Sequence, residues 1–240
     1  MTCAADNWSR CAPDVLFAEV LPMNTEMLEE VLACPRLPSL PAIAAKVIEM
    51  TSDPDVSIKE LASVIQQDQA MAAKILRTVN SSFYGLRERC GTFDKAVVLR
   101  GLAPVKSLGL GFSLVAALPK PSDDGFDYQA YWRRSLYSGV AAREIAKLVP
   151  GVDEDEAFLA ALFQDVGMMS LHMVMPDRYS EVLIQADGDH RKLMKFELST
   201  LEVSHAESGG MLCERWKLPE SLIHPVRFHE RPSAAPTQAV

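Results

Sequence analysis

Apolar residues recur along this chain at the spacing of an α-helix. Ile43, Val47 and Met50 fall on one face of a predicted helix, and Leu61 and Ile65 fall on one face of the next predicted helix. No segment alternates apolar and polar residues over the length of a strand, which would be the pattern of a half-buried β-strand. The chain is therefore predicted to be all-α.

Capping residues and helix breakers set the ends of the predicted helices. Residues 57–60 (Ser-Ile-Lys-Glu) and 204–207 (Ser-His-Ala-Glu) match the capping box, in which two side chains satisfy free backbone N–H groups at a helix start. Asp68 and Thr92 are predicted to be single caps. The predicted helices span residues 24–32, 41–50, 58–66, 69–79, 93–99, 104–118, 128–149, 153–163, 177–186, 192–201, 205–216 and 219–230.

One stretch rich in breakers divides the chain. Pro119, Pro121 and Gly125 lie close to three aspartates between residues 119 and 127. This boundary predicts two helical lobes, residues 34–118 and 126–230, that form one domain over 34–230. Residues 1–33 are predicted to be a lead-in with a short helix, and residues 231–240, which are rich in Pro and Ala, a flexible tail.

Composition and charge exclude several classes of protein. With 48% hydrophobic and 23% charged residues in 240, the chain is globular rather than disordered. A net charge of -8 gives no overall attraction to nucleic acid or to an anionic membrane. The N-terminus lacks the apolar core of a signal peptide, and the longest uncharged apolar run, residues 107–118, is too short to span a bilayer. Five scattered cysteines without a C-x-x-C pair argue against a disulfide framework. We therefore expect a cytoplasmic protein.

Residues 161–167 (Ala-Leu-Phe-Gln-Asp-Val-Gly) contain the chain's main candidate for chemistry. Asp165 follows an apolar helix, and the negative end of a helix dipole disfavours a further negative charge. A metal, a cation or hydrogen-bond donors must therefore compensate it. His205 and His229 lie downstream and could complete a metal site with Asp165. The alternative is that Asp165 bridges helices and the histidines are ordinary polar residues.

Several motifs together resemble the HDOD domain, a branch of the HD superfamily found in bacterial signalling proteins. The likeness covers roughly residues 34–230 and is carried by residues 37–41 (Leu-Pro-Ser-Leu-Pro), 61–80, 83–85 (Phe-Tyr-Gly), 97–102, 131–142, 158–167 and 205–219. The resemblance implies a two-lobed, multi-helix fold with an HD-like C-terminal lobe.

The resemblance also bears on catalysis. Active HD phosphohydrolases use a first His, an adjacent His-Asp pair and further His or Asp ligands around one or two metals. In this chain, Arg134 stands at the position that resembles the first His, and Gln164 stands at the position of the His in the His-Asp pair. Only Asp165, His205 and His229 therefore match metal-type positions. Arginine is cationic and has no acceptor atom, so it cannot bind a metal. We expect a vestigial site with an Arg134–Asp165 ion pair, and with no metal, no cofactor and no catalytic residue.

The main functional hypothesis is a non-catalytic bacterial signal-transduction module. By resemblance, its partners would be response regulators or enzymes of the diguanylate cyclase and phosphodiesterase class, with a homodimer left open and no membrane contact. An alternative is a metal-dependent phosphohydrolase acting on nucleotides or cyclic dinucleotides. A second alternative is DNA binding through residues 58–80, which resemble a helix-turn-helix with Lys74 and Arg77 on the second helix, although the net charge makes nucleic acid an unfavourable partner.

Overall fold

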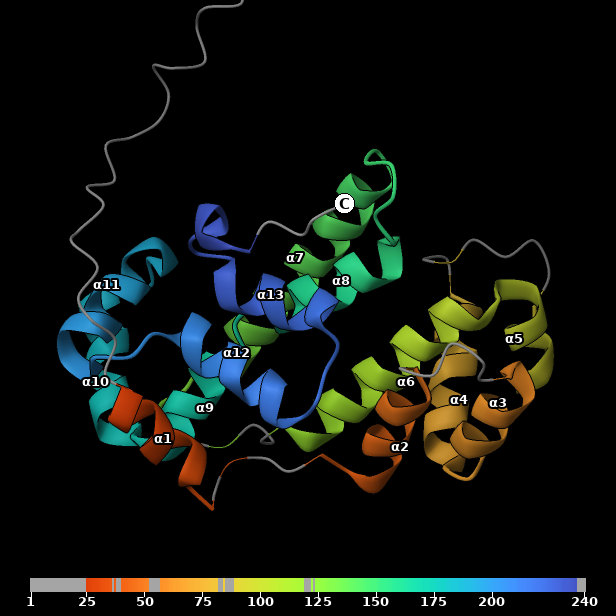
Figure 1. Cartoon of the computed structure of the whole chain (residues 1–240), viewed down its shortest axis with the longest axis horizontal. Coiled ribbons are helices and arrows are strands. Elements are labelled where there is room, and N and C mark those ends of the chain that lie inside the picture. Colours follow the sequence, from red (N-terminus) through yellow and green to blue (C-terminus); the bar gives the residue numbers. More distant parts are fainter. Residues whose placement is uncertain are drawn as a thin grey trace, which may run out of the picture.

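The structure is a computed structural model in which the described residues form two groups of helices (Figure 1). It describes residues 25–51 without 36, 38 and 39, then 57–81, 84, 89–118, 122 and 124–236. Every regular element in these ranges is an α-helix apart from one 3₁₀ turn near the end, and none is a strand. The prediction of an all-α fold is confirmed.

The N-terminal lobe consists of five helices. They are α2 (Ala42–Thr51), α3 (Ile58–Gln66), α4 (Gln69–Val79), α5 (Phe93–Arg100) and α6 (Leu102–Ala117). The predicted capping box is complete at Ser57 and Glu60, and the caps of α4 and α5 form at Asp68 and Thr92 as predicted. The buried faces of α3 and α4 consist of apolar side chains such as Leu61 and Ile75, both 0% exposed. The hydrophobic effect therefore stabilises this lobe.

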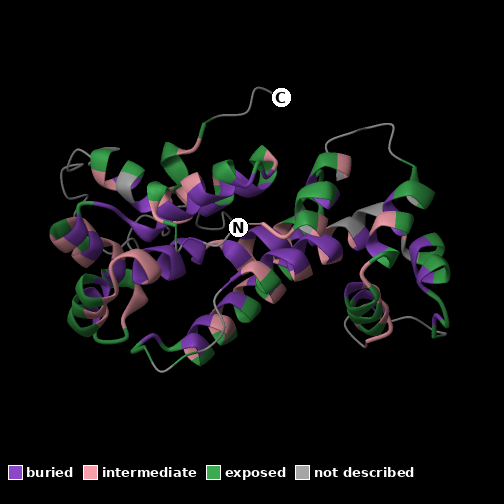
Figure 2. Cartoon of the chain, turned by 90° about the horizontal axis from the view of Figure 1, so that it is seen from below, coloured by how far each residue is buried: buried purple, intermediate pink, exposed green. Residues whose placement is uncertain are grey.

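The HD-like lobe contains the remaining helices of the domain. They are α7 (Tyr128–Ala146), α8 (Glu154–Phe163), α9 (Val166–Val174), α10 (Pro176–Ala186), α11 (His190–Leu201), α12 (His205–Arg215), α13 (Glu220–Phe228) and the 3₁₀ turn η1 (Pro232–Ala234). Buried faces point inward in both groups of helices, and exposed faces point outward (Figure 2).

Tyr84 and the helix α6 join the two lobes. The helix α6 contacts α8 as well as α2 and α4. Tyr84 lies just beyond α4, and its hydroxyl donates to the buried Asp155 carboxylate of α8 at 3.4 Å. The Arg143 guanidinium of α7 lies 4.7 Å from the centre of the Tyr84 ring and pairs with Asp155 at 3.4 Å. The motif at residues 83–85 therefore contributes an aromatic anchor between the lobes.

The first described helix packs on the HD-like lobe. Helix α1 (Thr25–Ala33) contacts α9 and α12, and its Leu28 and Val31 are each 1% exposed. The Arg215 guanidinium of α12 donates to the Leu32 carbonyl. The short helix predicted within residues 1–33 is therefore present as α1, and it packs on the HD-like lobe; residues 1–24 lie outside the described part.

Other boundaries also differ from the prediction. Helix α9 was not predicted, because Met168, Met169 and Leu171 are buried on different sides of it and leave no amphipathic period to detect. The capping box predicted at Ser204 is half formed: the Ser204 hydroxyl accepts from the Glu207 N–H. The tail predicted to be flexible contains η1, which lies against α13.

One apolar stretch is long enough to cross a membrane by length and composition. It runs over residues 154–174, and 67% of its apolar window is buried inside the structure. Asp165 divides it into α8 and α9. Both helices pack in the core of the HD-like lobe, so we interpret the stretch as a pair of core helices.

Candidate metal centre

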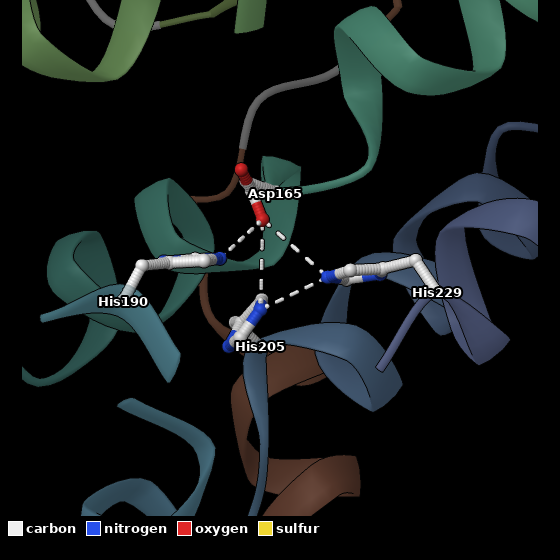
Figure 3. Close-up of side chains that lie close together, drawn as sticks. All are labelled: Asp165, His190, His205 and His229. Atoms are coloured by element: carbon white, nitrogen blue, oxygen red, sulfur yellow. Dashed lines mark hydrogen bonds and ion pairs between the residues drawn. The ribbon is translucent and has the colours of Figure 1, made fainter. Parts of the chain in front are cut away.

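Four ligand-type side chains converge in the HD-like lobe (Figure 3). Asp165, His190, His205 and His229 each offer one ligand atom, and all four atoms lie within 4.8 Å of one another. Asp165 joins α8 to α9, His190 begins α11, His205 begins α12, and His229 follows α13. The cluster thus gathers the ends of five helices. Three of its members, Asp165, His205 and His229, are residues that the sequence proposed.

Asp165 is fully buried, and its two oxygens have different surroundings. Oδ2 accepts a hydrogen bond from Arg134 Nε at 3.1 Å, so the predicted ion pair is present. Oδ1 has no hydrogen-bond partner among the described residues. It lies 3.3 Å from His190 Nε2, 3.4 Å from His229 Nε2 and 3.6 Å from His205 Nε2. The sequence had suggested that the Asp165 charge faces the negative end of α8. Asp165 also lies at the start of α9, where the positive end of the helix dipole favours a negative charge.

A buried carboxylate holds His205 in place. Glu197 Oε2 lies 2.7 Å from His205 Nδ1 and accepts the His205 backbone N–H at 2.9 Å. Glu197 Oε1 accepts from the Tyr179 hydroxyl at 2.9 Å. Burial raises the pKa of Tyr179 well above its usual value, so its hydroxyl remains a donor. This chain of contacts directs His205 Nε2 into the cluster, in the way that carboxylates orient metal-binding histidines.

The tautomer of His229 follows from its neighbour. His229 Nδ1 lies 2.8 Å from the Val226 carbonyl oxygen, which can only accept, so Nδ1 carries the proton. In the neutral ring, Nε2 then presents a lone pair to the cluster. His205 Nε2 lies 3.2 Å away. If His205 Nδ1 donates to Glu197, two lone pairs face each other, and a cation between them removes the repulsion.

Protonation can supply that positive charge when no metal does. Burial lowers the pKa of His205, but Glu197 and Asp165 outweigh burial and raise it to about 9. Burial raises the pKa of Asp165, yet the imidazoles of His190 and His229 outweigh burial and hold it well below its usual range. The centre is therefore built to contain positive charge, either as a proton or as a metal ion.

The spacing of the ligand atoms fits a metal ion. Donors of a tetrahedral site with bonds of about 2.0–2.1 Å lie about 3.3 Å apart. Asp165 Oδ1 lies 3.3, 3.4 and 3.6 Å from the three nitrogens, and His205 lies 3.2 Å from His229. Three imidazoles with a carboxylate suit first-row transition metals better than Mg²⁺ or Ca²⁺. The unpartnered Oδ1 and these four distances are compatible with a metal ion; the expectation of no metal, which was made without His190, stays a prediction.

Gln164 is separate from this cluster. It lines a cavity of about 560 Å³ between α7, α8 and α13, which His229 and Phe228 also border. The cavity has the size of a small-molecule site. Of the five positions that the sequence named, the structure brings Arg134, Asp165, His205 and His229 together, and Gln164 faces the neighbouring cavity.

The sequence analysis missed His190 and Glu197. His190 follows the cap Asp189 as His205 follows the cap Ser204, so both histidines are the first residue of a capped helix. This repeated local pattern could have identified His190. Glu197 lies seven residues further along α11 and is fully buried. Its apolar surroundings come from the packing of helices, which a single sequence does not reveal.

These features define a class: a two-lobed helical protein with a cluster of three histidines and Asp165 in its C-terminal lobe, beside an Arg134–Asp165 ion pair. The family model for the HDOD domain matches residues 37–232. The chain therefore belongs to the HDOD family, which is related to the HD phosphohydrolase superfamily. The resemblance inferred from the motifs is confirmed.

Similar proteins agree with the fold. A structure provisionally described as a phosphohydrolase from Shewanella amazonensis SB2B is 25% identical, with a TM-score of 0.74 over 88% of this chain and 74% of that chain. A provisionally described signal transduction protein from Marinobacter aquaeolei VT8 is 25% identical, with a TM-score of 0.70 over 84% of this chain and 46% of that chain.

One curated relative is an uncharacterized protein of Treponema pallidum (strain Nichols). It is 28% identical over an alignment of 215 residues, which covers 85% of this chain and 40% of that protein. This chain therefore spans about two fifths of the length of that relative.

Proposed function

We propose that this chain is a non-catalytic, cytoplasmic signal-transduction module that acts through protein contacts, and that its HD-type centre holds one divalent metal ion. The observation that carries the proposal is the Arg134–Asp165 ion pair at 3.1 Å. Arg134 occupies the position that resembles the first His of active HD phosphohydrolases. In an active enzyme, the metal would supply Lewis-acid chemistry and an activated water.

Arg134 opposes a second metal ion for an electrostatic reason. A dinuclear centre needs a carboxylate that reaches both ions, and Asp165 Oδ2 accepts from the Arg134 guanidinium instead. That guanidinium is permanently charged and has no lone pair. Its Nη2 also contacts Met168 Sδ at 3.0 Å, so the side chain is held on both sides. One ion beside Asp165 Oδ1 is compatible with this arrangement.

The neighbouring cavity is a poor site for a phosphate ester. Its lining is mainly apolar, and its charged members are Asp153 and Glu156. No Lys or Arg is among the lining residues. Phosphate recognition relies on Arg, Lys, backbone N–H groups or metal ions to balance the anionic charge. The two acids would instead repel a phosphate.

A hydrolysis assay with a gain-of-metal variant tests the non-catalytic assignment. Wild-type protein loaded with Mn²⁺, Fe²⁺ or Zn²⁺ is expected to leave bis-(4-nitrophenyl) phosphate and cyclic di-GMP intact. The double variant Arg134→His, Gln164→His restores both missing histidines and is expected to bind one metal ion more than the wild type. Metal-dependent turnover by the wild type would overturn the proposal.

Exposed apolar side chains support action through protein contacts. Ten large hydrophobic residues are exposed in the described part, and six of them lie on α7 or in the turn after it: Leu136, Tyr137, Ile145, Leu148, Val149 and Val152. Tyr137 of α7 and Leu148 in the turn after it are 68% and 82% exposed. Such a concentration is typical of a surface that a protein partner covers. We propose a response regulator or a cyclic-dinucleotide enzyme as that partner.

A matched pair of variants tests the α7 surface. Tyr137→Glu, Leu148→Glu introduces charge on α7 and in the turn after it, while Ile184→Glu introduces charge at a 77% exposed residue of α10. Binding of purified response regulators and diguanylate cyclases is measured for each protein. The α7 variant is expected to lose binding that the wild type and Ile184→Glu retain. Equal binding by all three would contradict the proposed surface.

His190 favours a second candidate, a metal-dependent phosphohydrolase, because it adds a fourth ligand to the three that the sequence offered. The hydrolysis assay above decides between the two candidates. DNA binding through α3 and α4 has less support: Lys74 and Arg77 are exposed on α4, but the whole chain carries a net charge of -8. A flat titration with duplex DNA at physiological ionic strength is the expected result.

A further inference from the structure

Glu230 places a second carboxylate beside the three imidazoles. Its Oε1 lies 3.7 Å from His190 Nε2, 3.8 Å from His205 Nε2 and 3.8 Å from His229 Nε2. It is not part of the group of four residues whose ligand atoms all lie within 4.8 Å of one another. Since Oε1 is close to all three nitrogens, it faces them from the side away from Asp165. The imidazole nitrogens therefore lie between two carboxylates.

No other cation pairs with Glu230 in the described part of the chain. The ion pairs of Glu230 all involve the three histidines of the cluster. Glu197 differs in this respect, because its two oxygens are occupied by Tyr179 and His205. Glu230 is 22% exposed in its side chain, so its charge is partly withdrawn from water. A carboxylate in this setting gains most from a cation at the point where the three nitrogens converge.

Glu230 also lines a cavity of about 220 Å³ that Phe228 and Arg231 border. A metal bound by Asp165 and three imidazoles has four protein donors, and a water molecule could be its next ligand. A carboxylate oxygen at that point takes the place of the water. A closed coordination sphere is the mark of a structural metal site, whereas catalytic sites keep one position open.

We infer that Glu230 is the fifth ligand of a first-row transition metal at this centre, in a position that a water molecule would otherwise take. The inference rests on the proposed metal site and adds to it. Three imidazole nitrogens and two carboxylate oxygens suit Zn²⁺, Fe²⁺ or Mn²⁺. The carboxylate ties the end of α13 to the starts of α11 and α12, so the ion joins three helices of the HD-like lobe.

The test counts water molecules on the bound metal. The full chain is loaded with Mn²⁺, and the relaxation of water protons reports ligand waters that exchange with solvent. Since Mn²⁺ favours six ligands and the proposed site supplies five, wild-type protein is expected to show at most one exchanging water. Glu230→Ala is expected to gain at least one exchanging water, and to bind Zn²⁺ about tenfold more weakly, which is the order of effect known for groups around a metal. Glu230→Gln keeps the size of the side chain and removes its charge, and is expected to weaken binding similarly.

Glu181→Gln is the matched control, because Glu181 is exposed on α10 and belongs to no metal cluster. It is expected to behave as the wild type. The same number of exchanging waters in the wild type and in Glu230→Ala, with Zn²⁺ affinity unchanged, overturns the role of Glu230 and leaves the metal site standing. A wild-type chain that takes up no Zn²⁺ or Mn²⁺ overturns the metal site, and the role of Glu230 with it.

Discussion

The two lobes bury different kinds of side chain. Eleven polar or charged residues are buried in the described part, and ten of them lie in the HD-like lobe. The exception is Ser113 of α6, whose hydroxyl donates to the Gly109 carbonyl one helical turn away. The N-terminal lobe thus has an apolar interior, while the HD-like lobe encloses carboxylates, histidines and Arg143.

This difference indicates where the function lies. A buried charge destabilises a fold unless it is paired and hydrogen-bonded, so a lobe needs no such groups for stability alone. Glu197 and Asp165 are both fully buried and both contact His205, whereas the buried Arg143–Asp155 pair lies apart from them beside Tyr84. The N-terminal lobe can be understood from hydrophobic packing, whereas the interior of the HD-like lobe needs positive charge at the histidine cluster, carried by a proton or by the proposed metal ion.

The largest expected effect is the gain in the free energy of unfolding when Zn²⁺ binds to the HD-like lobe. Zn²⁺ at about a thousand times its dissociation constant should raise the free energy of unfolding of the wild type by about 4 kcal/mol. Asp165→Ala should show no such gain, because it loses the ligand that contacts all three imidazoles. Urea unfolding with and without Zn²⁺ measures the gain. A full gain in Asp165→Ala would place the metal elsewhere.

The apolar core of the N-terminal lobe gives the next effect. Leu61 is fully buried in α3, and Leu61→Ala should lower the free energy of unfolding by about 3 kcal/mol through the lost burial and the cavity left behind. The gain on adding Zn²⁺ should remain that of the wild type. Leu61→Met, which keeps most of the volume, is the control and should cost less than about 1.5 kcal/mol.

Glu197→Gln tests whether the buried carboxylate orients His205. The amide keeps the size of the side chain but removes the charge beside His205 Nδ1, 2.7 Å away. Affinity for Zn²⁺ should fall about 10- to 100-fold. Isothermal titration calorimetry measures the change. Tyr179→Phe removes only the hydrogen bond to Glu197 Oε1 and should have a smaller effect. The reverse order of effects would contradict the assigned roles.

A smaller effect is expected from a single cap in the N-terminal lobe. The Ser57 hydroxyl accepts from the Glu60 N–H at 3.2 Å, and Glu60 Oε2 accepts from the Ser57 N–H at 3.0 Å. Ser57→Ala should lower the free energy of unfolding by about 1 kcal/mol. The Zn²⁺ dissociation constant should not change, since the cap is remote from the centre. A changed constant would show that the lobes are coupled.

The smallest effect concerns pH at the boundary between the lobes. Burial raises the pKa of Asp124, but hydrogen bonds from Ser122, Phe126 and Tyr128 outweigh burial and lower it to about 2. Its stabilising contribution should be complete above the ordinary pKa of 3.8 and be lost as pH falls through about 2. Asp124→Asn should flatten the acid side of the stability curve in that window. An unchanged curve would contradict this assignment.

The sequence predicted the N-terminal lobe more fully than the centre. Amphipathic spacing and caps such as Asp68 are local signals, and α3 and α4 have the predicted bounds. Helix α9 is apolar on several sides and lacks that signal. The Arg134–Asp165 pair could be predicted because family motifs aligned the two positions. His190 and Glu230 are brought to the centre by the packing of α11 against α12 and by the end of α13, which no local pattern encodes.

The most direct test of the account is the number of metal ions that the folded chain binds. Native mass spectrometry of protein titrated with Zn²⁺ or Mn²⁺ counts them. The Arg134–Asp165 ion pair and the four-residue cluster predict saturation at one ion per chain. Saturation at two ions would contradict the account, because it would mean that Arg134 does not prevent a dinuclear, hydrolytic type of centre. A chain that binds no ion would contradict it as well.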